Sequence, residues 1–259
     1  MAKPTVPILS LTDVGKSFDV GGKRIEALRG ANLEIERGDF VCLIGASGCG
    51  KSTLLRIVAG FETATTGEAL MWGKPIVGPD PSRGMVFQDY GLFPWLSVRG
   101  NIGFGPASRG RPPAEVRETV ERFIELVGLG RFADAYPHQL SGGMKQRVAI
   151  ARVLANDAEV VLMDEPFGAL DAMTRERLQD ELLELWERTK LTVLFVTHSI
   201  EEAIFLSSRC VVMSPGPGRI DRDIPITLPR PRDVSAPDFN ELRRELSGML
   251  HSHHGRQAA

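Results

Sequence analysis

Five short motifs hold the residues of this chain that could do chemistry, and they follow one another in a fixed order. They are GASGCGKS (45–52), Gln88, LSGGMKQR (140–147), VVLMDEP (160–166) and His198. Glycine-rich segments that open helices bind phosphate, and acids at a strand end hold a divalent cation or activate water. Together the motifs predict hydrolysis of ATP between two copies of the chain.

The first motif fits the phosphate-loop pattern G-x-x-x-x-G-K-[ST]. An apolar strand (40–44) precedes it and a helix with leucine spacing (52–60) follows, so the loop meets a helix N-terminus, which favours anions. We expect Lys51 to reach the β and γ phosphates and Ser52 to bind Mg²⁺. The alternative is a glycine-rich turn with an incidental lysine. The predicted nucleotide contacts are Gly45, Ala46, Ser47, Gly48, Cys49, Gly50, Lys51, Ser52 and Thr53.

Two carboxylates end the apolar run 160–163, and ligands of open α/β sheets gather at such strand ends. We expect Asp164 to hold Mg²⁺ and Glu165 to orient or deprotonate the attacking water. His198 ends the apolar strand 192–197 and is expected at the same edge. The alternatives are a pair of solvated acids and a structural histidine.

LSGGMKQR predicts a second anion-binding helix N-terminus. Ser141 is a good helix cap, Gly142 and Gly143 permit close backbone approach, and residues 144–155 continue as a helix. One phosphate loop does not need a second anion site from the same chain. A head-to-tail pair of chains does, because the second site of one copy can cover the nucleotide held by the other.

In this order the motifs resemble those of the ATP-binding subunits of ABC transporters, over about residues 8–215. The resemblance implies an α/β fold, that of a P-loop ABC ATPase with a RecA-like nucleotide core, an antiparallel β subdomain and a helical signature subdomain. It also implies a homodimer that binds two ATP with Mg²⁺ through its facing sites.

The resemblance assigns further roles by position. Gln88 would contact Mg²⁺ and sense the γ phosphate, and His198 would hydrogen-bond the γ phosphate in the transition state. With Lys51 and Glu165, these two residues form the expected catalytic set. Asp171 would lie at the dimer seam, and Phe18 would stack on the adenine, although Phe18 as a core residue is a serious alternative.

The chain departs from the family pattern at three positions. Met144 stands where the signature usually has glutamine, which removes any polar contact of that residue with the opposing nucleotide. Gly168 replaces the usual serine of the segment before Asp171, and Phe18 replaces the more frequent tyrosine with its ring face kept. None of these changes removes a group assigned to chemistry.

The organisation expected for residues 1–259 is a single ABC ATPase domain. The nucleotide core with its β subdomain takes about 1–96 and 157–215, the helical subdomain about 97–156, and a short C-terminal extension about 216–259. Alternating segments within 8–36 and 67–77 predict the antiparallel sheet, and 115–129 is a clear amphipathic helix. A last helix is expected near 238–250.

An aromatic-rich segment, QDYGLFPWLSV (88–98), follows the glutamine. Clustered aromatic side chains in a surface loop indicate a partner site. In the family this region receives a cytoplasmic helix of the membrane permease, and the alternative for Phe93 and Trp95 is internal packing. The candidate permease contacts are Tyr90, Phe93, Trp95 and Leu96.

The aromatic segment and the tail MSPGPGRI…LPRPRD (213–233) resemble the importer branch that serves nitrate, sulfonates and taurine. That branch works with a permease dimer and an extracytoplasmic solute-binding protein, and the solute itself never touches this subunit. The alternatives are the ATPase of another importer or of an exporter, and a soluble ABC ATPase of chromosomes or ribosomes. Chromosome proteins of that kind have long coiled coils between the motifs, and the ribosomal ones have two sets of motifs.

Composition agrees with this prediction. A net charge of −2 gives no reason to expect nucleic-acid binding, and three cysteines, an odd number without a signal-peptide pattern, suggest reduced thiols in the cytosol. Cys49 lies near a helix N-terminus, a setting that lowers the pKa of a thiol. The alternative is that Cys49 is simply a small residue tolerated at that position. No apolar stretch approaches the roughly 20 residues of a membrane span, so we expect a peripheral protein at the cytoplasmic face of the inner membrane.

Overall fold

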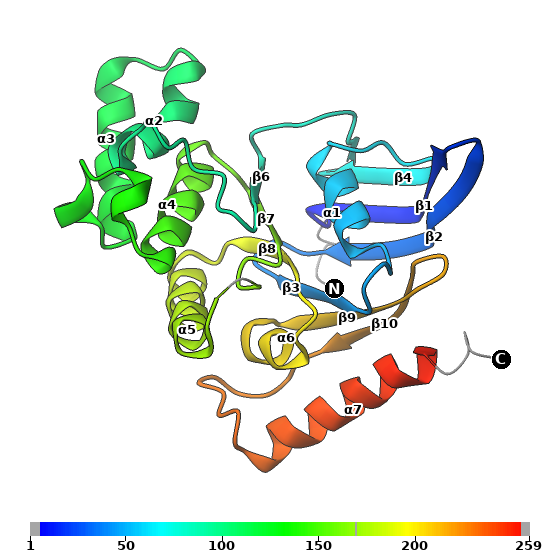
Figure 1. Ribbon diagram of the computed structural model, residues 1–259. Helices are drawn as coiled ribbons and strands as arrows, with labels where there is room; N and C mark the ends of the chain where they lie inside the picture. The colour runs from blue at the N-terminus through cyan, green and yellow to red at the C-terminus, as the bar shows by residue number, and fades with distance from the viewer. Residues whose placement is uncertain (1–5, 169, 255–259) are drawn as a thin grey trace, which may run out of the picture. The chain divides into compact units, whose positions relative to one another are not determined.

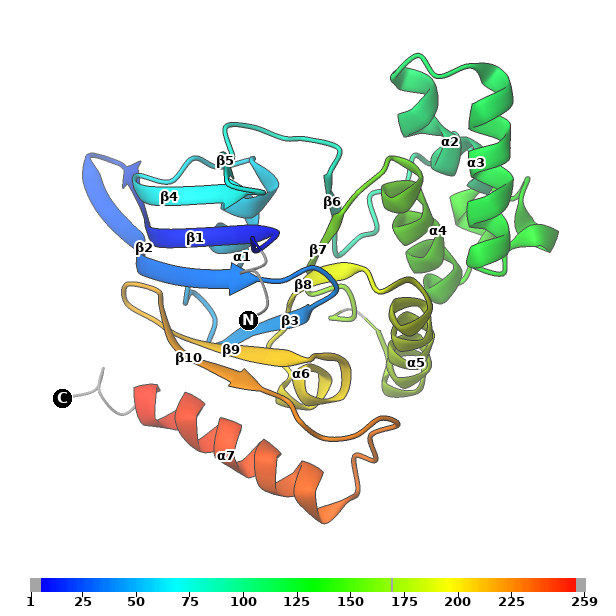
Figure 2. The same ribbon diagram turned by 180° about the vertical axis from the view of Figure 1, so that it is seen from behind.

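The computed structural model describes residues 6–168 and 170–254 and divides the chain into two compact units. The first unit contains the described residues up to Pro79 and those from Leu191 onward, and the second runs from Asp80 to Lys190. Figures 1 and 2 show the elements of each unit from two sides. Within these described residues, no helix combines the length and the apolar character needed to cross a bilayer.

An antiparallel sheet forms one part of the first unit, with the strand order β2-β1-β4-β5. The first two strands join at Gly21 and Gly22, whose φ angles of 56° and 77° suit a two-residue hairpin turn. The alternating pattern of the sequence therefore predicted this sheet correctly. Its strands are β1 (Leu9–Val20), β2 (Lys23–Ile35), β4 (Thr66–Met71) and β5 (Lys74–Pro75).

A second sheet of the first unit has the order β10-β9-β3-β8, in which β3 pairs in parallel with both of its neighbours. Every residue of β3 and β8 is buried, as expected of apolar runs in a parallel sheet covered by helices. Helices α1 (Lys51–Ala59) and α6 (Ile200–Leu206) pack against it. The strands are β3 (Phe40–Gly45), β8 (Thr192–Val196), β9 (Arg209–Ser214) and β10 (Arg219–Pro225).

The chain beyond β10 folds back onto α6. The guanidinium of Arg232 donates hydrogen bonds to the carbonyl oxygens of Ile204 and Ser207 at the C-terminal end of that helix. A cation is favourable there because it satisfies free carbonyls and the helix dipole, while burial lowers the pKa of Arg232 to about 10. Helix α7 (Pro237–His254) then lies beside α6 and β9 with Phe239 buried (Figure 2), which confirms the predicted last helix.

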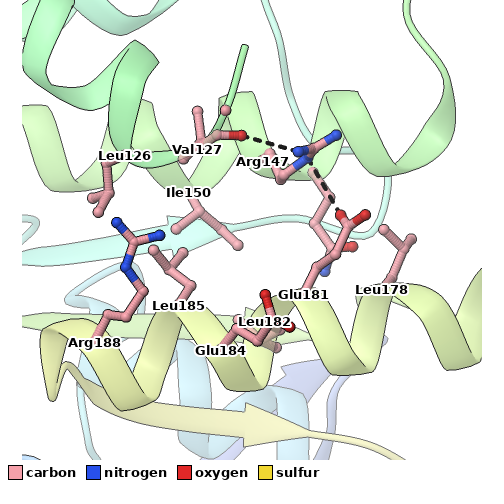
Figure 3. Close-up of a pocket in the computed structure, with 12 residues that line it drawn as sticks. Leu126, Val127, Arg147, Ile150, Leu178, Glu181, Leu182, Glu184, Leu185 and Arg188 are labelled. Atoms are coloured by element: carbon pink, nitrogen blue, oxygen red, sulfur yellow. Dashed lines mark hydrogen bonds and ion pairs between the residues drawn. The ribbon is translucent and has the colours of Figure 1, made fainter.

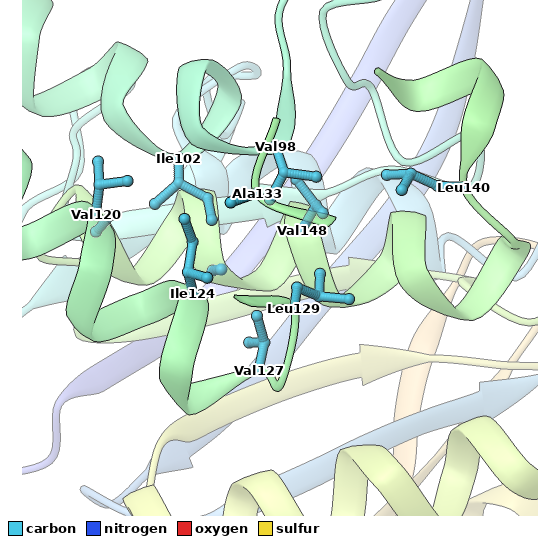
Figure 4. Close-up of a cluster of buried hydrophobic side chains, with 11 residues drawn as sticks. Val98, Ile102, Val120, Ile124, Val127, Leu129, Ala133, Leu140 and Val148 are labelled. Carbon is cyan, nitrogen blue, oxygen red and sulfur yellow. The ribbon is translucent and has the colours of Figure 1, made fainter. Parts of the chain in front are cut away.

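The second unit contains one parallel strand pair, β6 (Arg83–Val86) with β7 (Val160–Asp164), and a set of helices. Its aliphatic core is built by α2, α3 and α4 (Figure 4), where Ile102, Ile124 and Val148 are buried. The predicted amphipathic helix is confirmed as α3. The helices are α2 (Val98–Ser108), α3 (Pro113–Leu126), α4 (Gly142–Ala155) and α5 (Ala172–Thr189), with 3-10 turns η1 (Gly130–Phe132) and η2 (Pro137–Gln139).

Candidate functional site

The phosphate loop joins the end of β3 to the start of α1, as the sequence predicted. Gly48 and Gly50 have φ angles of 77° and 88°, in the left-handed region that suits glycine. A Cβ atom at Gly45 would lie 2.5 Å from both Cys49 Sγ and the carbonyl oxygen of Met213. The glycines are therefore required by the path of the backbone, before any ligand is considered.

Lys51 lies across this loop and is buried. Its Nζ donates hydrogen bonds to the carbonyl oxygens of Gly45 (2.8 Å) and Ala46 (3.2 Å), and it lies 3.8 Å from Cys49 Sγ. Because a buried ammonium needs such partners, the loop backbone holds the positive charge in place. The structure thus provides a fixed cation at the N-terminus of α1.

The expectation of a lowered thiol pKa at Cys49 is wrong. Cys49 is 1% exposed, and this burial raises the pKa of its thiol even though Lys51 is adjacent. The cost of placing a thiolate in a poorly solvated position exceeds the attraction of the lysine and the helix N-terminus. Cys49 therefore stays a neutral thiol at pH 7.

Ser52 and Asp164 offer the oxygen ligands that Mg²⁺ prefers. Ser52 is exposed on the first turn of α1, and Asp164 is the half-buried last residue of β7. Ser52 belongs to the first unit and Asp164 to the second, and each offers a type of ligand that Mg²⁺ accepts beside water and nucleotide phosphates. Each residue is therefore chemically suited to Mg²⁺ bound with a nucleotide.

Gln88 and Glu165 are brought together within the second unit. A Cβ atom at Gly168 would lie 3.2 Å from Gln88 Nε2 and 3.7 Å from Glu165 Oε2, so both side chains reach this glycine. Glu165 has a φ of 46°, a left-handed conformation that is uncommon outside glycine and marks a constrained position. The absence of a side chain at Gly168 leaves room for the two polar groups.

The signature segment begins α4 with a side-chain cap. Ser141 has extended backbone angles, and its Oγ accepts a hydrogen bond from the Met144 N–H at 3.3 Å. A Cβ atom at Gly143 would lie 2.5 Å from a methyl carbon of Leu178 on α5, whereas one at Gly142 would lie 3.4 Å from its nearest neighbour. Gly143 is therefore required by the packing of α4 on α5.

His198 and the phosphate loop lie at the same edge of the second sheet of the first unit. β8 runs parallel to β3, with Val196 opposite Leu43, so the chain leaves both strands at their carboxyl ends. His198 is exposed, and the preceding Thr197 donates a hydrogen bond of 2.5 Å to the buried Glu202 of α6. That hydrogen bond fixes the backbone next to the histidine.

Asp171 and Phe18 hold different kinds of position. Asp171 caps α5 by accepting a hydrogen bond from the Thr174 N–H at 3.0 Å, and this bond lowers the pKa of its carboxyl group. Phe18 is a half-buried residue of β1, with the ammonium of Lys16 4.9 Å from its ring centre. Its ring is thus only partly covered by the protein.

Two polar side chains that sequence reasoning missed hold the aromatic segment. The fully buried Asn101 bonds to both backbone groups of Phe93 (2.9 and 3.1 Å), and Arg152 donates to the carbonyl oxygen of Gly91 at 2.6 Å. The Phe93 ring packs against Phe104 with 4.5 Å between centres, whereas Trp95 is 68% exposed. The anchoring of this segment could have been suspected from an asparagine on an apolar helix.

The predicted residues fall into two groups. Phe18, the phosphate loop and His198 belong to the first unit. Gln88, the signature, the acidic strand end and Asp171 belong to the second. Each group is assembled by the strand ends and helix starts of its own unit.

One family model and several known proteins match this chain. A family model described as ABC transporter matches residues 28–168. The nitrate import ATP-binding protein of Synechocystis sp. is 47% identical over 253 residues, covering 93% of this chain and 94% of that protein. The taurine import ATP-binding protein of Roseobacter denitrificans is 44% identical, with 93% of each chain covered. An aliphatic sulfonates import ATP-binding protein of Bacillus cereus is 46% identical, covering 92% of this chain and 94% of that protein.

Solved structures agree with these relatives. A dimeric ATP-binding cassette in a post-hydrolysis state with ADP and Pi has a TM-score of 0.71 and 33% identity, covering 85% of this chain and 99% of its own. CbiO1 from Clostridium perfringens, part of an ABC transporter complex, has a TM-score of 0.77 and 29% identity, covering 95% of this chain and 98% of its own. The predicted fold class is confirmed.

Proposed function

Because this chain belongs to the ABC transporter family and is an ATPase of that family, we propose that it energises a membrane importer for a small solute of the nitrate, sulfonate or taurine type. Relatives named for the import of these three solutes cover more than nine-tenths of the chain. These relatives carry the importer proposal, and two helix N-termini, one with a buried lysine and one with a serine cap, support the ATP sites.

We propose that one copy holds the ATP phosphates with its loop backbone, Lys51 and Ser52. Mg²⁺, held by Ser52, Asp164 and Gln88, would neutralise phosphate charge and orient the γ phosphate. Phe18 would stack on the adenine with its partly covered ring, a contact of about 1 to 3 kcal/mol, so most of the affinity comes from the phosphates.

The second copy would complete each site. Ser141, Gly142 and Gly143 of that copy would present the N-terminus of α4 to the γ phosphate, and Asp171 would lie at the seam between copies. Solved relatives that are dimers support this arrangement. Closing the pair would exclude all water except the attacking molecule.

Hydrolysis would then depend on three side chains. Glu165 would accept a proton from the attacking water, Gln88 beside it would help to position that water, and His198 would donate a hydrogen bond to the γ phosphate as charge develops. The shared environment of Gln88 and Glu165 around Gly168 supports this assignment. Loss of the γ phosphate would remove the charge that bridges the two copies, and the pair would reopen.

Coupling to transport would use the aromatic segment. We assign the permease contact to Tyr90, Phe93, Trp95 and Leu96, because Trp95 is exposed and Asn101 and Arg152 fix the backbone around it. The protein would then be peripheral at the cytoplasmic face of the membrane. The permease would in turn receive the solute from an extracytoplasmic binding protein.

We propose that residues 1–259 form one domain, with a helical subdomain at about 97–156 and a C-terminal extension from about 216. The aliphatic core shared by α2, α3 and α4 supports the helical subdomain as a packed group. On this proposal, the signature at the start of α4 moves together with the aromatic segment that precedes α2.

Size-exclusion chromatography of purified Glu165→Gln with and without Mg-ATP tests the proposal. Without the base, ATP should bind without being hydrolysed, so a shift from monomer to dimer is expected only with Mg-ATP. A variant that binds ATP yet remains monomeric, alone and with its permease, would contradict the paired site. The same variant carrying Lys51→Ala is the matched control and should remain monomeric.

A further inference from the structure

A pocket of about 170 Å³ opens in the second unit between the end of α3, helix α4 and helix α5 (Figure 3). Its walls combine polar and charged side chains with aliphatic ones, among them Leu126, Ile150, Leu182 and Leu185. None of its lining residues is a predicted contact of the nucleotide or of the permease. The proposed function therefore leaves this pocket unexplained.

Gln146, one of the lining residues, is 2% exposed, and neither Nε2 nor Oε1 of its amide has a hydrogen-bond partner within the described part of the chain. Buried polar groups are almost always paired, so a buried amide that lacks both kinds of partner indicates a missing one. Water and a polar ligand are the two kinds of partner that could fill this role, because charged side chains also line the pocket, and a binding experiment separates the two.

The charged groups of the pocket balance one another. Arg147 donates to the carbonyl oxygen of Val127 at 3.0 Å, and its Nε lies 3.3 Å from Glu181 Oε2 (Figure 3). That second distance makes an ion pair, although its angles do not make a hydrogen bond. Glu184 and Arg188 add one charge of each sign at exposed positions. The pocket thus favours a neutral occupant.

We propose that this pocket binds a small neutral molecule with an amide edge, an N–H donor and a carbonyl acceptor side by side, on an apolar ring. Such an edge is the complement of the Gln146 amide, which would turn toward the pocket on binding to form two hydrogen bonds. The volume suits one ring, since an apolar cavity of about 150 Å³ accommodates benzene. A cyclic amide, or lactam, has both features.

Occupancy of the pocket would act on both helices that form it. Helix α4 begins beside Ser141 and α5 begins beside Asp171, so a bound molecule would fix the start of one helix against the other. A change in ATP turnover on binding is therefore expected. This consequence rests on the proposed function, whereas binding itself does not.

Binding is tested on the full chain with 2-piperidone, a cyclic amide, by ligand-detected NMR and calorimetric titration without nucleotide. Saturable binding at millimolar concentration is expected, together with weak or absent binding of N-methyl-2-piperidone, which lacks the N–H donor. Gln146→Met should weaken binding about tenfold or more through loss of both hydrogen bonds. Gln179→Met, which replaces another buried glutamine that lies outside the pocket, should not weaken it.

The stability of Gln146→Met and ligand binding by a second variant, Leu126→Phe, separate a loss of binding from a loss of folding. Gln146→Met should fold at least as stably as the unmodified chain, because it removes an unpaired buried amide while keeping the side-chain length. Leu126→Phe, which places a ring in the pocket from its edge, should also abolish binding. Absence of saturable binding, equal binding by Gln146→Met, or equal affinity for the N-methyl compound would overturn the proposal, whatever the ATPase activity.

Discussion

The phosphate loop and the signature are both helix N-termini, but they are built in different ways. The loop enters α1 through left-handed glycines with no side-chain cap and contains the buried ammonium of Lys51. The signature enters α4 through an extended serine cap, and its first three helical residues carry no charge. The loop can hold an anion by itself, whereas the signature offers only N–H groups and a hydroxyl. On the proposed function, this difference is the reason why a second copy would bring its signature to a nucleotide held by the loop.

The largest effect on ATP turnover is expected from removal of Lys51, the cation that distinguishes the phosphate loop from the signature. Lys51→Ala should reduce ATP turnover about a thousandfold and abolish ATP binding, because the fixed cation of the loop is lost. The matched change at the other helix, Lys145→Ala, should leave both nearly unchanged, since the signature is expected to bind without a lysine. Phosphate release and binding of a fluorescent ATP analogue measure the two effects.

A methyl group in the signature should separate binding from hydrolysis. In Gly143→Ala the new Cβ would lie 2.5 Å from the Leu178 side chain and displace the start of α4. Turnover should fall about a hundredfold while a single copy still binds ATP. Gly130→Ala, whose Cβ meets open space, is the control and should behave like the unmodified chain. Loss of ATP binding by Gly143→Ala itself would show that the two helix starts are not independent.

Gly168→Ser tests whether the space beside Gln88 and Glu165 is needed for hydrolysis. The new Cβ would lie 3.2 Å from Gln88 Nε2, so the amide must shift by a few tenths of an ångström beside Glu165. We expect a several-fold decrease in kcat with an unchanged dissociation constant for ATP. An equal loss in both would place Gly168 in nucleotide binding instead of water positioning.

The smallest effect concerns the thiol of the phosphate loop. Since burial raises the pKa of Cys49, its reaction with N-ethylmaleimide at pH 7 should be much slower in the folded than in the unfolded chain, and should accelerate as pH rises. Cys49→Ala identifies the contribution of this thiol. The raised pKa also means that neutral Cys49 stabilises the fold below the pKa of the unfolded thiol, and that this stabilisation is lost as pH rises through the folded pKa.

The sequence was sufficient to predict the structure wherever one local pattern of residues determines it. The apolar runs of β3, β7 and β8 and the Ser141 cap were predictable because burial and capping depend on neighbouring residues. The bonds from Asn101 and Arg152 to the aromatic segment were not, since Arg152 reaches a carbonyl 61 residues away. The prediction for the Cys49 pKa was wrong because a helix N-terminus can be read from sequence, but the degree of burial cannot.

The hydrogen bonds of Arg232 also decide where this protein can be shortened or fused to another. A chain ended at Pro225 would leave the carbonyl oxygens of Ile204, Phe205 and Ser207 without the guanidinium that they share. These carbonyls close α6, the helix that follows His198 directly. The last segment is therefore part of the folded first unit that contains His198, and a tag or partner domain belongs beyond α7.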